Sequence, residues 1–160
     1  MSSFSNDPYE SIGFLANAAS RLMSMHLTRG FAALGLNVTA EQWNVLVQLW
    51  LEDGLNQLDI AERLFLEKSS VSRLVDGLEK KGLVRRVKGK DARNNYIYLT
   101  EFGWSMRDQS VEVGREVRRA AERDLTDEEL AVCKRALWSI CKTLSPGKRN
   151  EVSRFWTRVD

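Results

Sequence analysis

The sequence of 160 residues predicts a mainly α-helical protein with one small β-hairpin. Three observations support this fold class. Two helical patterns, a short one ending near Phe65 and a longer one beginning near Lys68, are separated by only a few residues. Two β-like runs then flank a polar, basic tip, and long helical patterns precede and follow this unit. Helix, turn, helix and hairpin in this order are typical of a winged helix-turn-helix.

The composition is that of a soluble globular protein, with 43% hydrophobic and 29% charged residues. No apolar run approaches the ~20 residues that a membrane-spanning helix needs. The start of the chain has neither a basic nor an apolar segment, so we expect no secretory signal and a cytoplasmic protein. Cys133 and Cys141 lie in one helical pattern about 12 Å apart along its axis, too far to form a disulfide with each other. We expect them to be buried, unreactive thiols.

Positive charge is concentrated in one part of the chain. The whole sequence has a formal net charge of +2. Residues 63–93 hold ten Lys/Arg and four Asp/Glu, an excess of six positive charges, so the remainder of the chain is net negative. A charge run is usually a solvated surface. Because this one coincides with the helix-turn-helix, we favour a nucleic-acid partner.

Two helices are predicted before the helix-turn-helix. The first opens with a capping pattern at residues 7–10, has apolar residues at helical spacing to about residue 33, and ends at Gly35. Residues 39–42 form a second capping box, which precedes a strongly apolar helix. That helix ends at the turn of residues 53–54, and we expect it to be the platform on which the helix-turn-helix packs.

The helix-turn-helix and the hairpin are predicted over residues 56–103. The first helix stops at Phe65, and the second, which would be the recognition helix, spans about residues 68–81. Gly82 follows it, because a residue without Cβ adopts the left-handed conformation that ends many helices. The strands are predicted at residues 83–87 and 96–99.

Two more helices are predicted after the hairpin. Thr100 caps a long, charged helix that continues to about residue 124, and residues 126–129 form a capping box for another helix, which is broken at residues 145–147. Terminal helices often pair with a second copy of the chain. A helical bundle around a two-fold axis is the natural way to bury their apolar faces.

Several linked motifs resemble the MarR (multiple antibiotic resistance regulator) family. They are SRLV at residues 72–75, LEKKGLV at 78–84, DxR at 91–93 and LTxxG at 99–103. The resemblance covers roughly residues 8–145. Ala92 stands where an arginine is common in the family.

The resemblance implies a single MarR-like domain over residues 1–160 that forms an obligate homodimer. Residues 8–35 and 105–160 would be dimerisation helices, and residues 39–103 would be the winged helix-turn-helix DNA-binding region. Some relatives sense peroxide through a cysteine near the N-terminal helix, where this chain has none.

The candidate DNA-binding residues lie on the recognition helix and the wing. Small hydroxyl side chains let a helix approach base edges, and an arginine can bind a guanine edge or a phosphate. Cations on a hairpin can straddle a minor groove, and a carboxylate there can orient an arginine; by resemblance Arg93 is the residue inserted into the groove. The candidates are Lys68, Ser69, Ser70, Ser72, Arg73, Arg86, Lys88, Lys90, Asp91 and Arg93.

Two alternatives stay open within this set. Ser69 and Ser70 could serve only to cap the recognition helix. Arg85 and Arg86 are neighbours on a strand and point to opposite sides, so at most one of them is expected to face DNA.

The resemblance also implies a cleft for small aromatic or phenolic ligands, whose binding alters the spacing of the two DNA-reading heads. Five tryptophans are many for this length, and a basic side chain could hold an anionic group. The candidate ligand-binding residues are Arg21, His26, Arg29, Trp43, Trp50 and Trp104. Ordinary core packing is the alternative for the tryptophans, and His26, the single histidine, is not expected to bind metal.

The function predicted from these features is a dimeric, sequence-specific DNA-binding transcriptional regulator. We expect a repressor that is relieved by a small ligand and binds a palindromic operator in double-stranded DNA. The alternative is a winged-helix protein-interaction module that does not bind DNA. The sequence has no Gly-rich phosphate loop and no Cys/His metal spacing, and we expect no enzyme activity, no catalytic residue, no cofactor and no metal.

Overall fold

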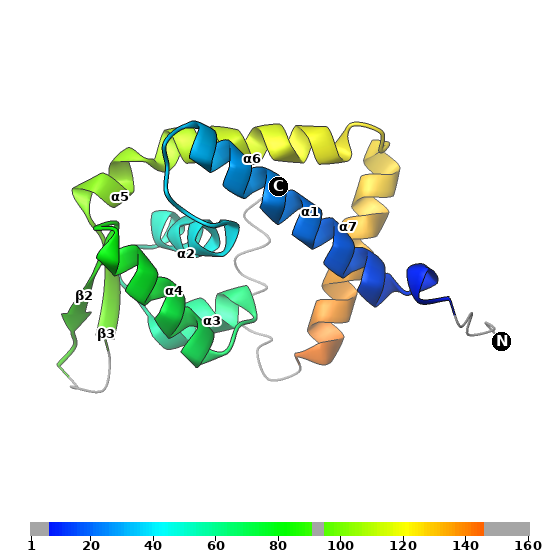
Figure 1. The fold of residues 1–160 in the computed structure, drawn as a ribbon. Helices are drawn as coiled ribbons and strands as arrows, with labels where there is room; N and C mark the ends of the chain where they lie inside the picture. The colour runs from blue at the N-terminus through cyan, green and yellow to red at the C-terminus, as the bar shows by residue number, and fades with distance from the viewer. Residues whose placement is uncertain (1–6, 91–94, 146–160) are drawn as a thin grey trace.

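The computed structural model describes residues 7–90 and 95–145. In Figure 1 the elements from α2 to β3 gather on the left, α6 runs across the top, α1 contacts α6 and slopes from the upper left to the lower right, and α7 descends from the right end of α6. The elements are a 3-10 turn at Pro8–Glu10, α1 (Ile12–Ala33), α2 (Ala40–Leu51), β1 (Leu55–Asn56), α3 (Gln57–Leu64), α4 (Lys68–Lys80), β2 (Val84–Lys88), β3 (Asn95–Leu99), α5 (Glu101–Ser105), α6 (Arg107–Glu122) and α7 (Asp127–Leu144).

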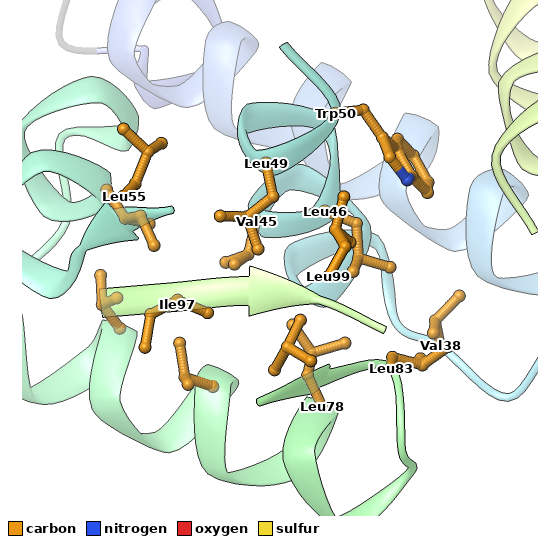
Figure 2. Close-up of a cluster of buried hydrophobic side chains, with 14 of the residues drawn as sticks. Val38, Val45, Leu46, Leu49, Trp50, Leu55, Leu78, Leu83, Ile97 and Leu99 are labelled. Atoms are coloured by element: carbon orange, nitrogen blue, oxygen red, sulfur yellow. The ribbon is translucent and has the colours of Figure 1, made fainter. Parts of the chain in front are cut away.

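The hydrophobic core is built around α2, as expected for a platform helix. Val45, Leu46 and Leu49 of α2 are fully buried, and side chains from α4 and β3 close over them. Figure 2 shows Leu78 of α4 and Ile97 of β3 pointing toward the same α2 residues. Because apolar burial is the main driving force of folding, these contacts fix α4 and the hairpin to one support.

The sheet contains three antiparallel strands in the order β1–β3–β2, where the sequence predicted two. Strand β1 has only two residues, too few for the alternating pattern that reveals a strand. The hairpin pairs Val84 with Leu99 and Lys88 with Asn95. Both hairpin strands are as predicted to within one residue at each end.

A side chain before β1 fixes the sheet to the end of α2. The Asp53 carboxylate accepts a hydrogen bond of 2.8 Å from the Leu99 backbone N–H, and the Gly54 N–H donates to the Ile97 carbonyl. The turn requires glycine at position 54, whose φ is +81°. The wing is therefore held by the hydrogen bonds between β2 and β3 and also by residues 53–54, which follow α2.

The predicted capping boxes are confirmed at α2 and α7. At α7 the Thr126 side chain accepts from the Glu129 N–H, while the Glu129 carboxylate accepts from the Thr126 N–H at 2.8 Å. Hydrogen bonds from Thr126, first from its backbone and then from its hydroxyl, lower the pKa of the Glu129 carboxyl. A lowered carboxyl pKa means that this stabilisation is present at neutral pH and is lost as the pH falls through the lowered pKa.

The predicted start of the first helix is wrong. The Asp7 carboxylate accepts a hydrogen bond from the Tyr9 N–H and its carbonyl accepts from Glu10, which closes a separate 3-10 turn. Helix α1 begins only at Ile12, after Ser11, which makes no side-chain capping bond. Asp7 therefore caps the short turn and not the long helix. Gly35 ends α1 as expected, with φ at +72°.

The long helix predicted after Thr100 is broken into α5 and α6. Thr100 caps α5 by accepting from the Gly103 N–H, as predicted. Met106 is a single turn residue between the two helices, with φ at −83° and ψ at −5°, and its side chain is buried in the core. A buried side chain at the junction is a tertiary effect that helical periodicity does not reveal.

Gly103 is the point of closest approach between α5 and the hairpin. Its carbonyl accepts a hydrogen bond of 3.1 Å from the buried Nε1–H of Trp50. A Cβ at this position would overlap the Leu83 carbonyl oxygen, which itself accepts from the Thr100 N–H. Gly103, the glycine of the LTxxG motif, is therefore required because any side chain there would clash with the hairpin backbone.

We expect Gly103→Ala to destabilise the fold by about 1–3 kcal/mol, because the added methyl forces backbone atoms apart. Gly13→Ala is the matched control, since a Cβ there would only meet the Ser11 hydroxyl at 3.6 Å and alanine favours a helix over glycine. Thermal unfolding followed by circular dichroism measures both. Equal melting temperatures for the two variants would contradict the close-approach explanation.

Candidate nucleic-acid interface

The two sides of α4 differ sharply in exposure. Val71, Val75 and Leu78 are fully buried against the core. Lys68 and Arg73 are exposed at the N-terminal half of the helix, where Ser69 is also exposed, and Ser70 and Ser72 are half-buried. The structure therefore places all five predicted α4 residues at or next to the accessible surface.

The turn before α4 has an unusual backbone. Phe65 adopts the left-handed conformation, with φ at +54°, and the Leu66 N–H closes the end of α3 by donating to the Ala61 carbonyl at 2.9 Å. Left-handed geometry disfavours a residue with a Cβ. The left-handed conformation of Phe65 turns the chain sharply, so that α4 begins three residues later with Glu67 as its N-cap.

Capping does not account for the serines of α4. Its N-cap, Glu67, makes no side-chain capping bond, and neither Ser69 nor Ser70 occupies the cap position. Their hydroxyls lie in the first turn, next to the backbone N–H groups that make a helix N-terminus favourable for phosphate. The first turn of α4 is therefore polar, uncapped by side chains and open.

The wing adds cations to the same end of the molecule. Lys88 at the end of β2 and Lys90 beyond it are exposed. Within residues 7–90 and 95–145, Lys68, Arg73, Lys88 and Lys90 form no ion pair with an acidic side chain. Asp91 and Arg93 lie outside the described residues. Uncompensated cations raise the local positive potential, which favours a polyanion.

Arg86 and Arg85 point to different sides of β2. Arg86 donates to Asp76, Glu79 and the Ser72 carbonyl, all on α4, and its side chain is 20% exposed. Arg85 is exposed, with its guanidinium 5.2 Å from the centre of the Tyr98 ring. A DNA contact by Arg86 stays a prediction, and its guanidinium is already bonded within the chain.

A second polar contact holds the other end of α4. The buried side chain of Gln42, which completes the capping box of α2, accepts a hydrogen bond of 2.7 Å from the Lys81 ammonium. A Cβ at Gly77 would overlap the Gln42 amide nitrogen, so a larger residue there would displace the Gln42 side chain. The sequence analysis assigned Gln42 to capping alone and did not foresee its contact with α4.

The six candidate ligand residues differ in their exposure and in their contacts. Arg21, His26 and Arg29 are exposed on α1, and Trp104 is 41% exposed on α5. Trp50 is buried and hydrogen-bonded to the Gly103 carbonyl, so core packing accounts for it.

Trp43 is different from the other candidates. Its ring packs against Phe31 of α1, with ring centres 5.6 Å apart, and faces Gly114 of α6. Its Nε1–H is buried and has no hydrogen-bond partner among residues 7–90 and 95–145. A buried donor without a partner is costly and uncommon, so this N–H is a candidate to bind a group outside the described chain.

One cavity of about 330 Å³ opens at the junction of α1 and α2. None of the six candidate residues lines it; its lining is Thr28, Ala32, Gly35, Leu36, Asn37, Val38 and Thr39. Among the described residues no cluster of three or more His, Cys, Asp or Glu side chains could hold a metal ion. No helix in this part of the chain is long and apolar enough to cross a membrane.

Helices α1 and α7 leave large apolar side chains uncovered. Helix α7 has 18 residues and none of the described ones is buried. Its Trp138 lies edge-on to Phe65 in the turn before α4, with ring centres 6.4 Å apart. The expectation of buried thiols is wrong for the single chain, because Cys133 is exposed and Cys141 is partly exposed. The uncovered side chains are Ile12, Phe14, Leu15, Leu22, Met23 and Met25 on α1 and Val132, Leu137, Ile140 and Leu144 on α7.

Comparison with known proteins identifies transcriptional regulators. A family model described as MarR family matches residues 38–94, from just before α2 into the wing. The organic hydroperoxide resistance transcriptional regulator of Bacillus subtilis (strain 168) is 28% identical over 134 residues, which are 82% of this chain and 87% of that protein. The HTH-type transcriptional regulator FarR of Neisseria gonorrhoeae is 32% identical over 108 residues, 66% of this chain and 73% of FarR.

The fold is also that of solved structures. CouR from Rhodococcus jostii RHA1, bound to p-coumaroyl-CoA, matches with a TM-score of 0.72 and 26% sequence identity, over 85% of this chain and 95% of that one. The match extends well beyond the winged helix, so it includes helices on both sides of it.

Proposed function

Since this chain belongs to the MarR family of transcriptional regulators, we propose that it is a homodimeric repressor that binds a palindromic operator and is relieved by a small ligand. Its relatives regulate transcription, and the proposal includes no catalytic activity. A regulator that acts on DNA works where the DNA is, and the cytoplasm is the compartment we propose.

The observation that carries the proposal is the two-sided character of α4. One side is fully buried in the core that α2 supports, and the other presents cations and hydroxyls that the described chain leaves uncovered. A helix fixed in this way can lie in a major groove with its N-terminal turn toward base edges. A module that bound only proteins would not need a face of unpaired cations.

The proposed DNA contacts follow from this placement. Residues 39–103 form the DNA-binding region, with α4 in the major groove and the wing in the adjacent minor groove. Arg93, in the wing tip, is the proposed minor-groove residue, oriented by Asp91. The proposed contacts on α4 and the wing are Lys68, Ser69, Ser70, Ser72, Arg73, Lys88, Lys90, Asp91 and Arg93.

We expect Arg73→Ala and Arg93→Ala each to weaken operator binding by about 1–3 kcal/mol if a base contact is lost. The probe is a duplex selected by the wild-type protein from a random library, and binding is measured by fluorescence anisotropy at several salt concentrations. Lys68→Ala should lower the slope of log affinity against log salt by ~0.9, the share of one neutralised phosphate. Unchanged affinity of both arginine variants at matched salt would contradict the proposed placement.

The uncovered faces of α1 and α7 support a homodimer. Residues 8–35 and 105–160 contain both helices, and each helix exposes several large apolar side chains in the described chain. On α7, Leu137, Ile140 and Leu144 recur at helical spacing and form one stripe. Contiguous exposed apolar surface marks an interaction site, and two-fold pairing of such stripes is the commonest solution.

We expect Leu137→Glu to convert the dimer to monomers at micromolar concentration, because it places a charge in the apolar stripe. Arg135→Glu is the matched control: position 135 is exposed on the opposite side of α7, so a dimer should remain. Sedimentation velocity measures the molecular mass of each variant. A wild-type protein that sediments as a monomer would contradict the dimer outright.

A small aromatic or phenolic ligand is proposed from the structural likeness to CouR, which was solved with p-coumaroyl-CoA. Among the described residues, the buried Trp43 indole N–H has no partner, and we propose that it donates a hydrogen bond to such a molecule. Arg21, His26 and Arg29 lie on the neighbouring helix α1, and Trp104 follows the wing. We retain them as proposed ligand residues; Trp50, already bonded to Gly103, would contribute packing.

We expect salicylate-like compounds at millimolar concentration to raise the melting temperature and to release the selected duplex. A ligand that binds the folded state stabilises it, and Trp43→Phe, which keeps the ring but removes the donor, should weaken both effects. Trp138→Phe serves as a control because Trp138 packs against Phe65 and is not among the proposed ligand residues. If neither the melting temperature nor the tryptophan fluorescence of the wild-type protein changes, this ligand class is excluded.

A further inference from the structure

The guanidinium of Arg86 joins the first wing strand to one side of α4. Its Nη2 donates to Asp76 Oδ1 at 2.5 Å and to the Ser72 carbonyl at 3.3 Å, and its Nη1 donates to Glu79 Oε2 at 2.5 Å. The Arg86 backbone N–H donates to the other oxygen of Glu79 at 3.2 Å. Both the strand backbone and the side chain are thus bonded to the helix.

The acceptors form a line along the recognition helix. Ser72, Asp76 and Glu79 are spaced four and three residues apart, which places them on one side of about two helical turns. A planar guanidinium that bridges three acceptors has a fixed orientation, unlike a single flexible ion pair. The contact therefore restrains the rotation of β2 about α4 as well as their separation.

The geometry points to Arg86 as a positioning residue that sets the angle between the wing and the recognition helix, and acts on DNA through that angle without contacting it. The inference rests on the proposed DNA-binding function. Lys88 is two residues further along the same strand, and the hairpin tip follows it. A rotation of β2 would therefore move the wing cations relative to Lys68 and Arg73 in the groove.

A direct contact is the competing explanation, and the charges of the partners distinguish the two. If Arg86 bound a phosphate, it would have to leave two carboxylates, and neutral partners would make this easier. Asp76 and Glu79 retain 51% and 41% of their side-chain exposure, so their negative charge also repels DNA. Neutralising them should raise affinity in a direct contact and lower it if Arg86 positions the wing.

The decisive experiment measures the affinity of the Asp76→Asn/Glu79→Gln double variant for the duplex selected by the wild-type protein. Positioning predicts a loss of roughly tenfold, the scale of one lost base or phosphate contact, although the variant removes two negative charges. Glu67→Gln is the matched control, because Glu67 is an exposed acid at the start of α4 with no capping bond, and its affinity should be unchanged or higher. Unchanged or higher affinity of the double variant would overturn the inference.

A double-mutant cycle gives a second readout that general destabilisation would not reproduce. Arg86→Gln should weaken binding strongly in the wild-type background and little in a Lys88→Ala/Lys90→Ala/Arg93→Ala background, whose wing contacts are already lost. Additive losses would show a direct contact and overturn the inference. Arg85→Gln, on the neighbouring exposed arginine, controls for loss of one positive charge, and melting temperatures confirm that each variant is folded.

The two proposals fail in different ways. If the wild-type protein selects no duplex from the library, the proposed function fails and the inference about Arg86 fails with it. If the wild-type protein binds its duplex and Arg73→Ala weakens binding, while the Asp76→Asn/Glu79→Gln variant binds at least as well as wild type, only the positioning role of Arg86 is lost.

Discussion

The burial of α2 is the constraint on which the rest of this structure depends. Its fully buried residues, among them Leu46 and Leu49, contact both the recognition helix and the wing strand β3. Two polar contacts refine that support: Asp53 bonds to β3, and Gln42 bonds to Lys81 at the end of α4. Apolar packing determines which elements meet. The two polar contacts then favour one of the arrangements that apolar packing allows. Breaking either contact would leave a buried or half-buried polar group without a hydrogen-bond partner.

Local chemistry made much of the fold predictable. The capping boxes at α2 and α7, the cap by Thr100 and the left-handed glycine at position 82 depend on residues a few positions apart, and all are confirmed. The features that sequence reasoning missed are non-local. Strand β1 exists only because β3 lies beside it, and the break at Met106 exists because the core takes up that side chain.

The same division holds for the candidate site. Exposure of Lys68 and Arg73 follows from helical periodicity once Val71 and Val75 are assigned to the core, and the structure agrees. The partners of Arg86 could not be predicted, since they require the hairpin to fold back on α4. Likewise, the hydrogen bond of Trp50 to Gly103 joins residues 53 positions apart. The sequence does not reveal such a distant partner, and Trp50 was therefore predicted as a ligand residue.

Helix α7 illustrates how strongly the state of this molecule depends on its neighbours. A helix of 18 residues without a buried side chain is at the edge of stability in water. If a second copy supplies the missing cover, the order of this segment follows mass action, and dilution alone would loosen it. The cellular abundance of the regulator would then set the fraction of chains with an intact C-terminal region, and repression would fade cooperatively as copy number falls.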